Sequence, residues 1–194
     1  MVLKETNIQE PLTRKVLMDY EELLQKSYSL IDENQVQRIM MNILNAQRVY
    51  FYGIGSSGLV AKEMKSRFTR LGLFCDAITD QDLMRMNSAL LDENCLVILL
   101  SISGETPAII SAIEHCRKRN ANIVLYTANK NLYLESLCDE LVIVATAKNL
   151  SYGNRVSPQL PLLVMVDLVY AYFLNSDIDM RSSHLTTTLE ALDD

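Results

Sequence analysis

Two short polar segments of the sequence contain the residue types that bind anions. "GIGSSG" covers residues 53–58 and "SISGET" covers residues 101–106, and each follows an apolar run and precedes a stretch with helical spacing. Small residues allow close backbone approach, hydroxyls donate hydrogen bonds, and the unpaired N–H groups of a helix N-terminus attract negative charge. Either segment alone can be explained equally well as an anion site or as a turn that leads into a capped helix. Two such segments together favour a phosphate site that needs no metal.

The first segment also matches a nucleotide-binding pattern. Gly53, Gly55 and Gly58 have the spacing G-x-G-x-x-G of dinucleotide-binding proteins, and Asp76 or Asp80 is available to hold a ribose. This pattern alone is weak evidence, and it predicts neither the serines inside the segment nor a second serine-rich segment. A nucleotide-binding fold is therefore kept only as a third hypothesis.

Cysteine and histidine are too sparse and scattered to predict a metal or redox centre. The four cysteines stand at positions 75, 95, 116 and 138 without a C-x-x-C pair, and the only histidines are His115 and His184. Cysteines within apolar segments are usually buried, reduced thiols. We expect no metal and no cofactor, and we expect His115 to serve packing or to lie at the surface.

The elements that must position these residues alternate between strand and helix. Five apolar runs predict strands at 48–55, 73–78, 95–103, 122–128 and 140–146, and amphipathic segments between them predict helices at 58–71, 81–91, 107–119 and 132–138. Continuous apolar runs are typical of parallel strands covered by helices on both faces. The predicted fold class is α/β, a three-layer α/β/α sandwich with a five-stranded, doubly wound parallel sheet of flavodoxin-like order. Both polar segments then follow the carboxyl ends of strands, where such sheets bind ligands.

Helices are predicted at both ends of the chain as well. The apolar spacing indicates helices over 12–31 and around 36–44 before the first strand, and over 157–174 and 179–192 after the last. The segment 157–174 is apolar on nearly every side, which indicates burial in the core or against another subunit.

The charge balance restricts the partners of the chain. Acidic residues outnumber basic residues by 24 to 18, and the net charge is −6. Nucleic-acid binding needs a concentrated basic surface, whereas the small basic cluster within residues 62–70 spreads over more than one side of a helix. The sequence has no run of roughly eighteen apolar residues and no secretory signal. We therefore expect a cytoplasmic protein without a membrane partner.

The stretches "GIGSSGLVAKEMKSRFTRLG" and "VILLSISGET" resemble the sugar isomerase (SIS) domain, a phosphosugar-binding α/β module, over residues 34–174. The sequences of both stretches are most similar to the effector domain of RpiR-type bacterial transcriptional regulators. The residues that this resemblance assigns to the sugar phosphate are Ser56, Ser57, Ser101, Ile102, Ser103, Gly104, Glu105 and Thr106. Lys148 and Arg155 are expected to add positive charge near the phosphate.

The resemblance also bears on catalysis. SIS isomerases use a general base, usually a glutamate after the fifth strand, often helped by a histidine, and the segment 146–157 here contains no carboxylate. The remaining weak candidates are Glu105, a carboxylate such as Asp80 or Asp82, and His184 acting from a neighbouring subunit. We therefore expect a phosphosugar sensor that does not convert its ligand, with a sugar-phosphate isomerase as the alternative.

The resemblance finally implies partners and a division of the chain. RpiR-type regulators carry a helix-turn-helix domain ahead of the SIS domain, and residues 1–46 are too few, and too acidic or neutral, to form one. We therefore expect DNA as a partner only through a helix-turn-helix domain absent from this chain, which is either part of a longer regulator or a stand-alone module. Residues 1–32 are expected to form an N-terminal helix and linker, and residues 33–194 a SIS domain that assembles as a homo-dimer or tetramer.

Overall fold

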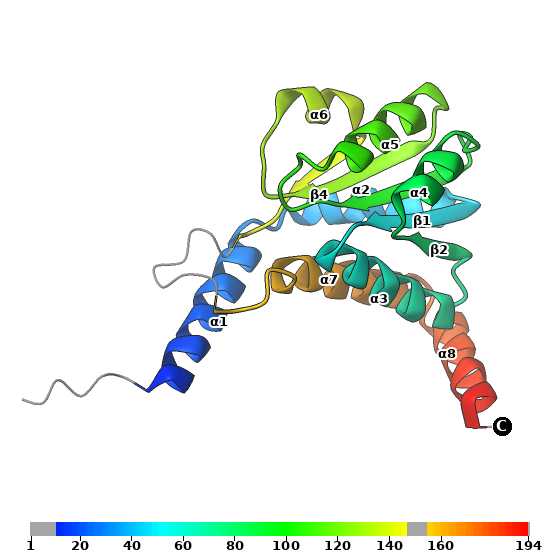
Figure 1. Cartoon of the computed structure of the whole chain (residues 1–194). Helices are drawn as coiled ribbons and strands as arrows, with labels where there is room; N and C mark the ends of the chain where they lie inside the picture. Colours follow the sequence, from blue (N-terminus) through cyan, green and yellow to red (C-terminus); the bar gives the residue numbers. More distant parts are fainter. Residues whose placement is uncertain (1–10, 147–154, 194) are drawn as a thin grey trace, which may run out of the picture.

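The computed structural model describes residues 11–146 and 155–193 and shows a sheet between two layers of helices (Figure 1). The strands are β1 (Arg48–Gly53), β2 (Cys75–Ile78), β3 (Cys95–Leu100), β4 (Asn122–Thr127) and β5 (Glu140–Ile143). All neighbouring strands are parallel, and their order is β2-β1-β3-β4-β5. The predicted three-layer sandwich with flavodoxin-like strand order is confirmed.

Helices cover both faces of this sheet. One face carries α4 (Gln81–Ser88), α5 (Pro107–Lys118) and α6 (Leu132–Leu137), and the other carries α2 (Glu33–Asn45), α3 (Ser56–Arg70) and α7 (Leu160–Ser176). Successive side chains of β3 alternate between the two cores, with Ile98 on the α3 side and Leu99 on the α5 side. All six β3 residues are buried, which explains why the sequence of this strand shows no polar alternation.

Strands β1 and β3 end earlier than their apolar runs suggest. The sequence predicts strands to Gly55 and Ser103, whereas the structure ends them at Gly53 and Leu100. The backbone has a positive φ at Gly55 (59°), two residues after β1, and at Gly104 (66°), four residues after β3, which is a conformation that does not continue a strand. Between Leu100 and Gly104, single hydrogen bonds still join Ser101 and Ile102 to Tyr126 and Ala128. The two polar segments follow these strand ends as loops.

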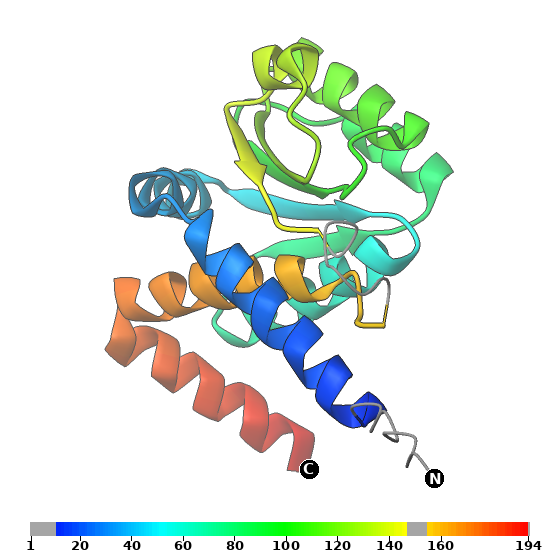
Figure 2. The ribbon, with the colours of Figure 1, turned by 90° about the vertical axis from the view of Figure 1, so that its left-hand side faces the viewer.

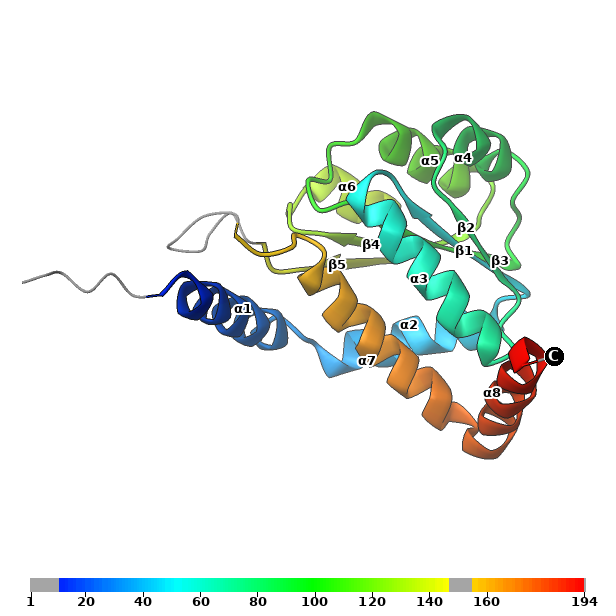
Figure 3. The same cartoon turned by 60° about the horizontal axis from the view of Figure 1, so that its bottom comes forward.

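The apolar helix near the C-terminus is buried within the chain itself. The buried residues of α7 are Pro161, Leu162, Val164, Met165, Val166, Val169 and Phe173. Helices α2 and α3 pack against α7, as do α1 (Leu12–Ser29) and α8 (Ile178–Asp193), which lie on the α7 side of the sheet at opposite ends of the molecule (Figures 2 and 3). Burial in the core, one of the two predicted environments, is confirmed.

No single helix in the described part of the chain is long and apolar enough to cross a membrane. Within those described residues, α7 and α8 taken together meet the requirements of length and composition, and their axes bend by 110° at the break between them. The apolar residues of α7 lie in the core that α2 and α3 share.

A partly buried ion pair fastens β5 to α2. The Glu140 carboxylate accepts hydrogen bonds from the Arg38 guanidinium and from Gln35 Nε2, the latter at 2.9 Å, and the Glu140 side chain is 11% exposed. Burial raises the pKa of Glu140, but the hydrogen bonds from Arg38 and Gln35 outweigh burial and hold the pKa below its ordinary value.

This ion pair makes the fold sensitive to acid. A carboxylate with a lowered folded-state pKa stabilises the fold above its unfolded-state pKa, about 4.3 for glutamate, and the contribution disappears as the pH falls through the folded-state value. We predict that Glu140→Gln flattens the dependence of the unfolding free energy on pH below about pH 5. Urea denaturation of both proteins across that range measures the difference. A variant that follows the wild-type curve would show that the pair contributes nothing to acid sensitivity.

Candidate functional site

The two predicted polar segments meet at one edge of the sheet. β1 and β3 are neighbours, paired from Arg48 and Cys95 to Gly53 and Leu100, so the loops that follow them leave the sheet side by side. Strand order reverses between β1 and β3, and doubly wound sheets bind ligands at such a position. A cavity of about 220 Å³ lies there, and its lining residues are Ile54, Ser56, Ser57, Leu100, Ser101, Ile102, Ser103, Thr106 and Pro158.

Two helices begin at this cavity without a side-chain cap. α3 starts after Gly55, and α5 starts after Thr106, whose hydroxyl makes no capping hydrogen bond. In contrast, Asp32, Asp80 and Asn131 cap α2, α4 and α6, and each accepts hydrogen bonds from two backbone N–H groups. The positive ends of α3 and α5 therefore face one cavity with N–H groups that no cap satisfies, which suits an anion. Thr106 occupies the N-cap position of α5, but the side-chain capping bond of the simpler explanation is absent.

Two of the serines that line the cavity are buried, whereas Ser56 and Ser103 are exposed. Ser101 is 3% exposed and Ser57 is 8% exposed. Ser101 Oγ lies 3.4 Å from Thr106 Oγ1, and Ser103 Oγ accepts the N–H of Glu105 at 3.2 Å. A buried hydroxyl costs free energy unless it finds good partners, and ligand oxygens in the cavity can supply them.

Glycine is required where the first loop approaches the helix behind it. A Cβ at Gly53 would lie 2.6 Å from the Ser57 carbonyl oxygen, and a Cβ at Gly58 would lie 2.9 Å from the Gly53 carbonyl oxygen. Gly55 has a positive φ. All three glycines of the dinucleotide-like pattern thus have a packing or backbone reason, so the pattern gives no separate support to nucleotide binding.

Residues after β4 hold the second loop, and the sequence analysis missed them. Thr127 Oγ1 donates to the Ile102 carbonyl at 3.4 Å and accepts the Asn129 N–H at 3.1 Å. Asn129 Nδ2 donates to the Ser103 carbonyl at 3.1 Å. A Cβ at Gly104 would lie 2.9 Å from Thr127 Oγ1. The one signal in the sequence is the polar stretch that ends the fourth apolar run.

We predict that Thr127→Val destabilises the protein by about 1–3 kcal/mol, because the nearly isosteric change leaves the Asn129 N–H without its acceptor and removes one donor to the Ile102 carbonyl, which keeps the Ala128 N–H. Urea denaturation measures the loss. Thr187→Val, at an exposed position of α8, is the matched control and should change stability by less than about 0.5 kcal/mol. Equal stabilities of the two variants would contradict a role for Thr127 in holding the loop.

The segment before α7 forms a further wall of the cavity. Pro158 lines it, and Gln159 Nε2 donates to the Ser56 carbonyl at 3.2 Å. The sequence analysis missed both residues, because nothing in the local pattern places the start of α7 beside the loop after β1.

The expectation for Arg155 is wrong. Its guanidinium pairs with the buried Asp19 carboxylate of α1, with Nε 2.9 Å from Oδ2 and Nη2 3.3 Å from Oδ1, so its charge is already compensated. Lys148, the other expected source of positive charge, lies outside the described residues, as does most of the segment 146–157 in which a catalytic base was sought.

The carboxylates considered as general bases lie elsewhere. Glu105 is exposed and, like Gly104, is not among the cavity-lining residues. Asp80 caps α4 by accepting the N–H groups of Asp82 and Leu83 at 3.0 and 2.9 Å, and the Asp82 side chain is 83% exposed. In the part of the chain that the structure describes, neither a carboxylate nor an imidazole lines the cavity.

The two histidines also lie away from the cavity. His115 of α5 is partly buried, with Nδ1 3.3 Å from Ser88 Oγ of α4, which confirms a packing role. His184 Nδ1 lies 3.3 Å from the Leu71 carbonyl oxygen, just past the end of α3 opposite to Ser56. The intervening helix is about 20 Å long, so His184 is remote from the cavity of its own chain, and a role in a neighbouring subunit stays a prediction.

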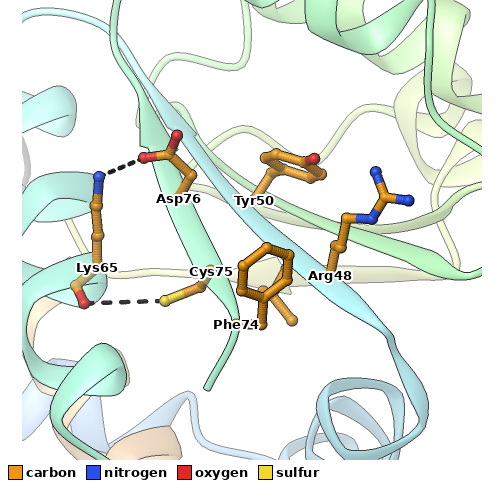
Figure 4. Close-up of a pocket in the computed structure, with 7 residues that line it drawn as sticks. Arg48, Tyr50, Lys65, Phe74, Cys75 and Asp76 are labelled. Atoms are coloured by element: carbon orange, nitrogen blue, oxygen red, sulfur yellow. Dashed lines mark hydrogen bonds and ion pairs between the residues drawn. The ribbon is translucent and has the colours of Figure 1, made fainter. Parts of the chain in front are cut away.

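A second cavity, of about 240 Å³, lies at the free edge of the sheet (Figure 4). Its lining residues are Arg48, Val49, Tyr50, Lys65, Phe74, Cys75 and Asp76. Lys65 Nζ is 2.6 Å from Asp76 Oδ1, so the lysine of this cavity already has a carboxylate partner. Because Lys65 stands in the middle of α3, this cavity also lacks the helix N-terminus that Ser56 and Ser57 provide. The cavity at the carboxyl ends of β1 and β3 is the better anion site.

Metal and thiol chemistry find no support in the described residues. Within residues 11–146 and 155–193, no group of three or more His, Cys, Asp or Glu side chains is arranged to hold a metal ion. The four cysteines are free; Cys95 and Cys116 are buried as expected, whereas Cys75 and Cys138 are partly exposed. Burial raises the pKa of Cys116 and of Cys138 to about 12, which keeps both thiols protonated.

The sequence of the chain is similar to a known domain family and to proteins named as regulators and as an isomerase. The SIS domain family matches residues 42–168. The transcriptional regulator RpiR of Escherichia coli K12, a helix-turn-helix type protein, is 22% identical over 165 residues, which make up 85% of this chain and 56% of RpiR. The 3-hexulose-6-phosphate isomerase of Mycobacterium gastri is 28% identical over 129 residues, which make up 66% of this chain and 62% of the isomerase. The chain thus spans little more than half of the length of these relatives.

A solved structure shows the same fold. The NanR protein of Vibrio vulnificus, complexed with ManNAc-6P, superposes with a TM-score of 0.84 at 22% sequence identity and covers 95% of this chain and 69% of NanR. The family match extends over both polar loops and the whole sheet. The chain therefore belongs to the SIS domain family.

Proposed function

We propose that this chain is a phosphosugar-binding domain that senses a sugar phosphate without converting it. The observation that carries the proposal is that α3 and α5 both begin uncapped at one cavity, together with the hydroxyls of Ser57, Ser101 and Thr106. A phosphate dianion satisfies unpaired N–H groups and hydroxyls at once, and the positive ends of two helices favour its charge. The site residues Ser56, Ser57 and 101–106 keep their predicted roles as part of this proposal.

Relatives supply the context of a regulator. RpiR is a helix-turn-helix type transcriptional regulator, and NanR is a protein with the same fold in complex with ManNAc-6P. We infer that this chain is the ligand-sensing and oligomerisation module of an RpiR-type regulator, in the cytoplasm, where DNA is accessible. Sensing requires a homo-dimer or tetramer with two arrangements that bind the sugar phosphate with different affinity. DNA is contacted through a helix-turn-helix domain outside this chain, and residues 1–32 serve as the helix and linker in front of the SIS domain, residues 33–194.

A sugar-phosphate isomerase is the second candidate, because the Mycobacterium gastri relative is a 3-hexulose-6-phosphate isomerase. Aldose–ketose isomerisation needs a general base within hydrogen-bond reach of the substrate carbon-bound proton. Two facts support the sensor over the isomerase: the cavity is lined by hydroxyls and apolar groups, and the sequence from Thr146 to Ser157 contains no carboxylate.

Calorimetry and proton exchange together test the proposal. We expect one or more members of a panel of hexose and amino-sugar phosphates, with ManNAc-6P among them, to bind, and the corresponding unphosphorylated sugars not to bind. Incubation of each bound sugar phosphate in deuterated water, read by NMR, should show no exchange at C1 or C2. Exchange would establish the isomerase, and a panel without any binding would refute both functions.

A further inference from the structure

The N-terminal helix packs on the segment that walls the cavity. The residues buried on α1 lie along one stripe that includes Asp19 and Leu23. Leu23 forms a small apolar cluster with Ala145 and Val156, which belong to the connection between β5 and α7. Figures 2 and 3 show α1 beside the start of α7. The position of α1 is therefore set by the chain segment that leads into α7.

A buried carboxylate on α1 holds one end of that segment. Asp19 is fully buried, and both of its carboxylate oxygens accept hydrogen bonds from the Arg155 guanidinium. A two-point contact of this kind fixes the orientation of both side chains, and removal of one partner leaves a buried charge without compensation. The contact therefore anchors the backbone at Arg155 to α1.

The C-terminal end of the same segment lies at the cavity and is hydrogen-bonded to α3. Three residues after Arg155, Pro158 lines the cavity, and the next residue, Gln159, donates to the carbonyl of Ser56 in the first turn of α3. The N–H of Gln159 is in turn bonded to Ser157 Oγ at 3.3 Å. Residues 155–159 thus form a short strap that runs from the Asp19 carboxylate to the cavity wall.

We propose that Asp19 is a positioning residue of the phosphosugar site, and that the strap 155–159 couples ligand binding in the cavity to the docking of α1. The proposal rests on the proposed function. Asp19 holds Arg155, Arg155 sets the position of Pro158 and Gln159, and these complete the wall beside Ser56. Coupling between two positions is reciprocal: a docked α1 raises ligand affinity, and bound ligand tightens α1 docking by the same factor. In a regulator whose DNA-binding domain precedes the SIS domain, α1 lies between the two in the chain. The effect of a bound ligand must then pass through α1 to reach the DNA-binding domain.

Calorimetry with ManNAc-6P, and in parallel with inorganic phosphate, tests the coupling. Asp19→Asn and Arg155→Gln should each weaken binding by about tenfold, a typical size for such coupling, and the double variant should be no weaker than Arg155→Gln, because both substitutions break the same Asp19–Arg155 pair. Arg155→Lys keeps the charge and should recover part of the affinity. Glu22→Gln, an equal change at an exposed position of α1, is the matched control and should bind like the wild type.

Hydrogen exchange separates positioning from simple destabilisation. Ligand should slow amide exchange in α1 of the wild type and of Glu22→Gln, and should leave α1 exchange unchanged in Asp19→Asn while still slowing exchange at residues 101–108. Wild-type affinity in Asp19→Asn, or a ligand effect on α1 that survives this substitution, overturns the coupling and leaves the proposed function intact. A wild-type protein that binds neither ManNAc-6P nor phosphate nor any member of the panel overturns the proposed function and the coupling with it.

Discussion

The double variant Ser101→Ala/Ser103→Ala is expected to bind sugar phosphates at least about 100-fold more weakly than the wild type. Ser101 is 3% exposed and stands with Ser103 on the loop at the uncapped start of α5. A hydrogen bond to a charged group contributes about 1.5–3 kcal/mol, and each 1.4 kcal/mol is about tenfold in affinity. Loss of two such bonds therefore exceeds two orders of magnitude, which calorimetry measures directly.

The fold should tolerate this change. Among the described residues, these hydroxyls make hydrogen bonds only within residues 101–106, so the melting temperature should fall by no more than a few degrees for a loss near 1 kcal/mol. Ser183→Ala, at an exposed position of α8, is the control and should bind like the wild type. Wild-type affinity in the double variant, in a protein that melts normally, would place the sugar phosphate outside this cavity.

Phe68→Ala is expected to cost about 3–5 kcal/mol of unfolding free energy. Phe68 of α3 is fully buried, and its ring lies 5.7 Å from that of Phe51, 5.5 Å from that of Phe173 and 5.6 Å from that of Tyr170. These rings belong to β1 and α7, so the side chain joins three elements at one point. Its removal leaves a cavity that three packed elements can only partly fill, and urea denaturation should show the loss.

The matched control is Phe74→Ala. Phe74 is 73% exposed beside the free edge of the sheet, and surface substitutions change stability by less than about 0.5 kcal/mol. The same chemical change should therefore cost much stability at Phe68 and little at Phe74, six residues away. Similar losses at both positions would mean that the packing of α3 against β1 and α7 contributes little to stability.

The alternation of apolar runs and amphipathic segments in the sequence is sufficient to predict the fold class. Strand β3 illustrates the reason: every residue of Cys95–Leu100 is apolar and buried, and only a strand covered on both faces needs such a composition. Strand ends were less accurately predicted. The predicted strands run two or three residues beyond the ends of β1 and β3, and composition alone does not show that the chain turns at glycines with a positive φ such as Gly55 and Gly104.

The residue types of the candidate site were also readable from the sequence. Serine, glycine and threonine after two buried strands indicated an anion site, and parallel strands bring their carboxyl ends to one edge. The sequence left two explanations of "SISGET" equally good, a helix cap or a ligand loop. The tertiary structure shows that the side-chain cap is absent, because Thr106 Oγ1 lies beside Ser101 Oγ and makes no hydrogen bond to the N–H groups of the helix.

Contacts between residues distant in the chain could not be derived from local patterns. Thr127 and Asn129 hold a loop that lies about two dozen residues earlier, and Arg155 pairs with a carboxylate 136 residues away. Periodicity reports which side of an element is buried, but it carries no information on which element covers it. The sequence by itself therefore determined the sheet, its covering helices and the chemistry of two loops. The tertiary structure alone showed that neither α3 nor α5 has a side-chain cap, that Arg155 pairs with Asp19 of α1, and that Pro158, three residues further on, lines the cavity.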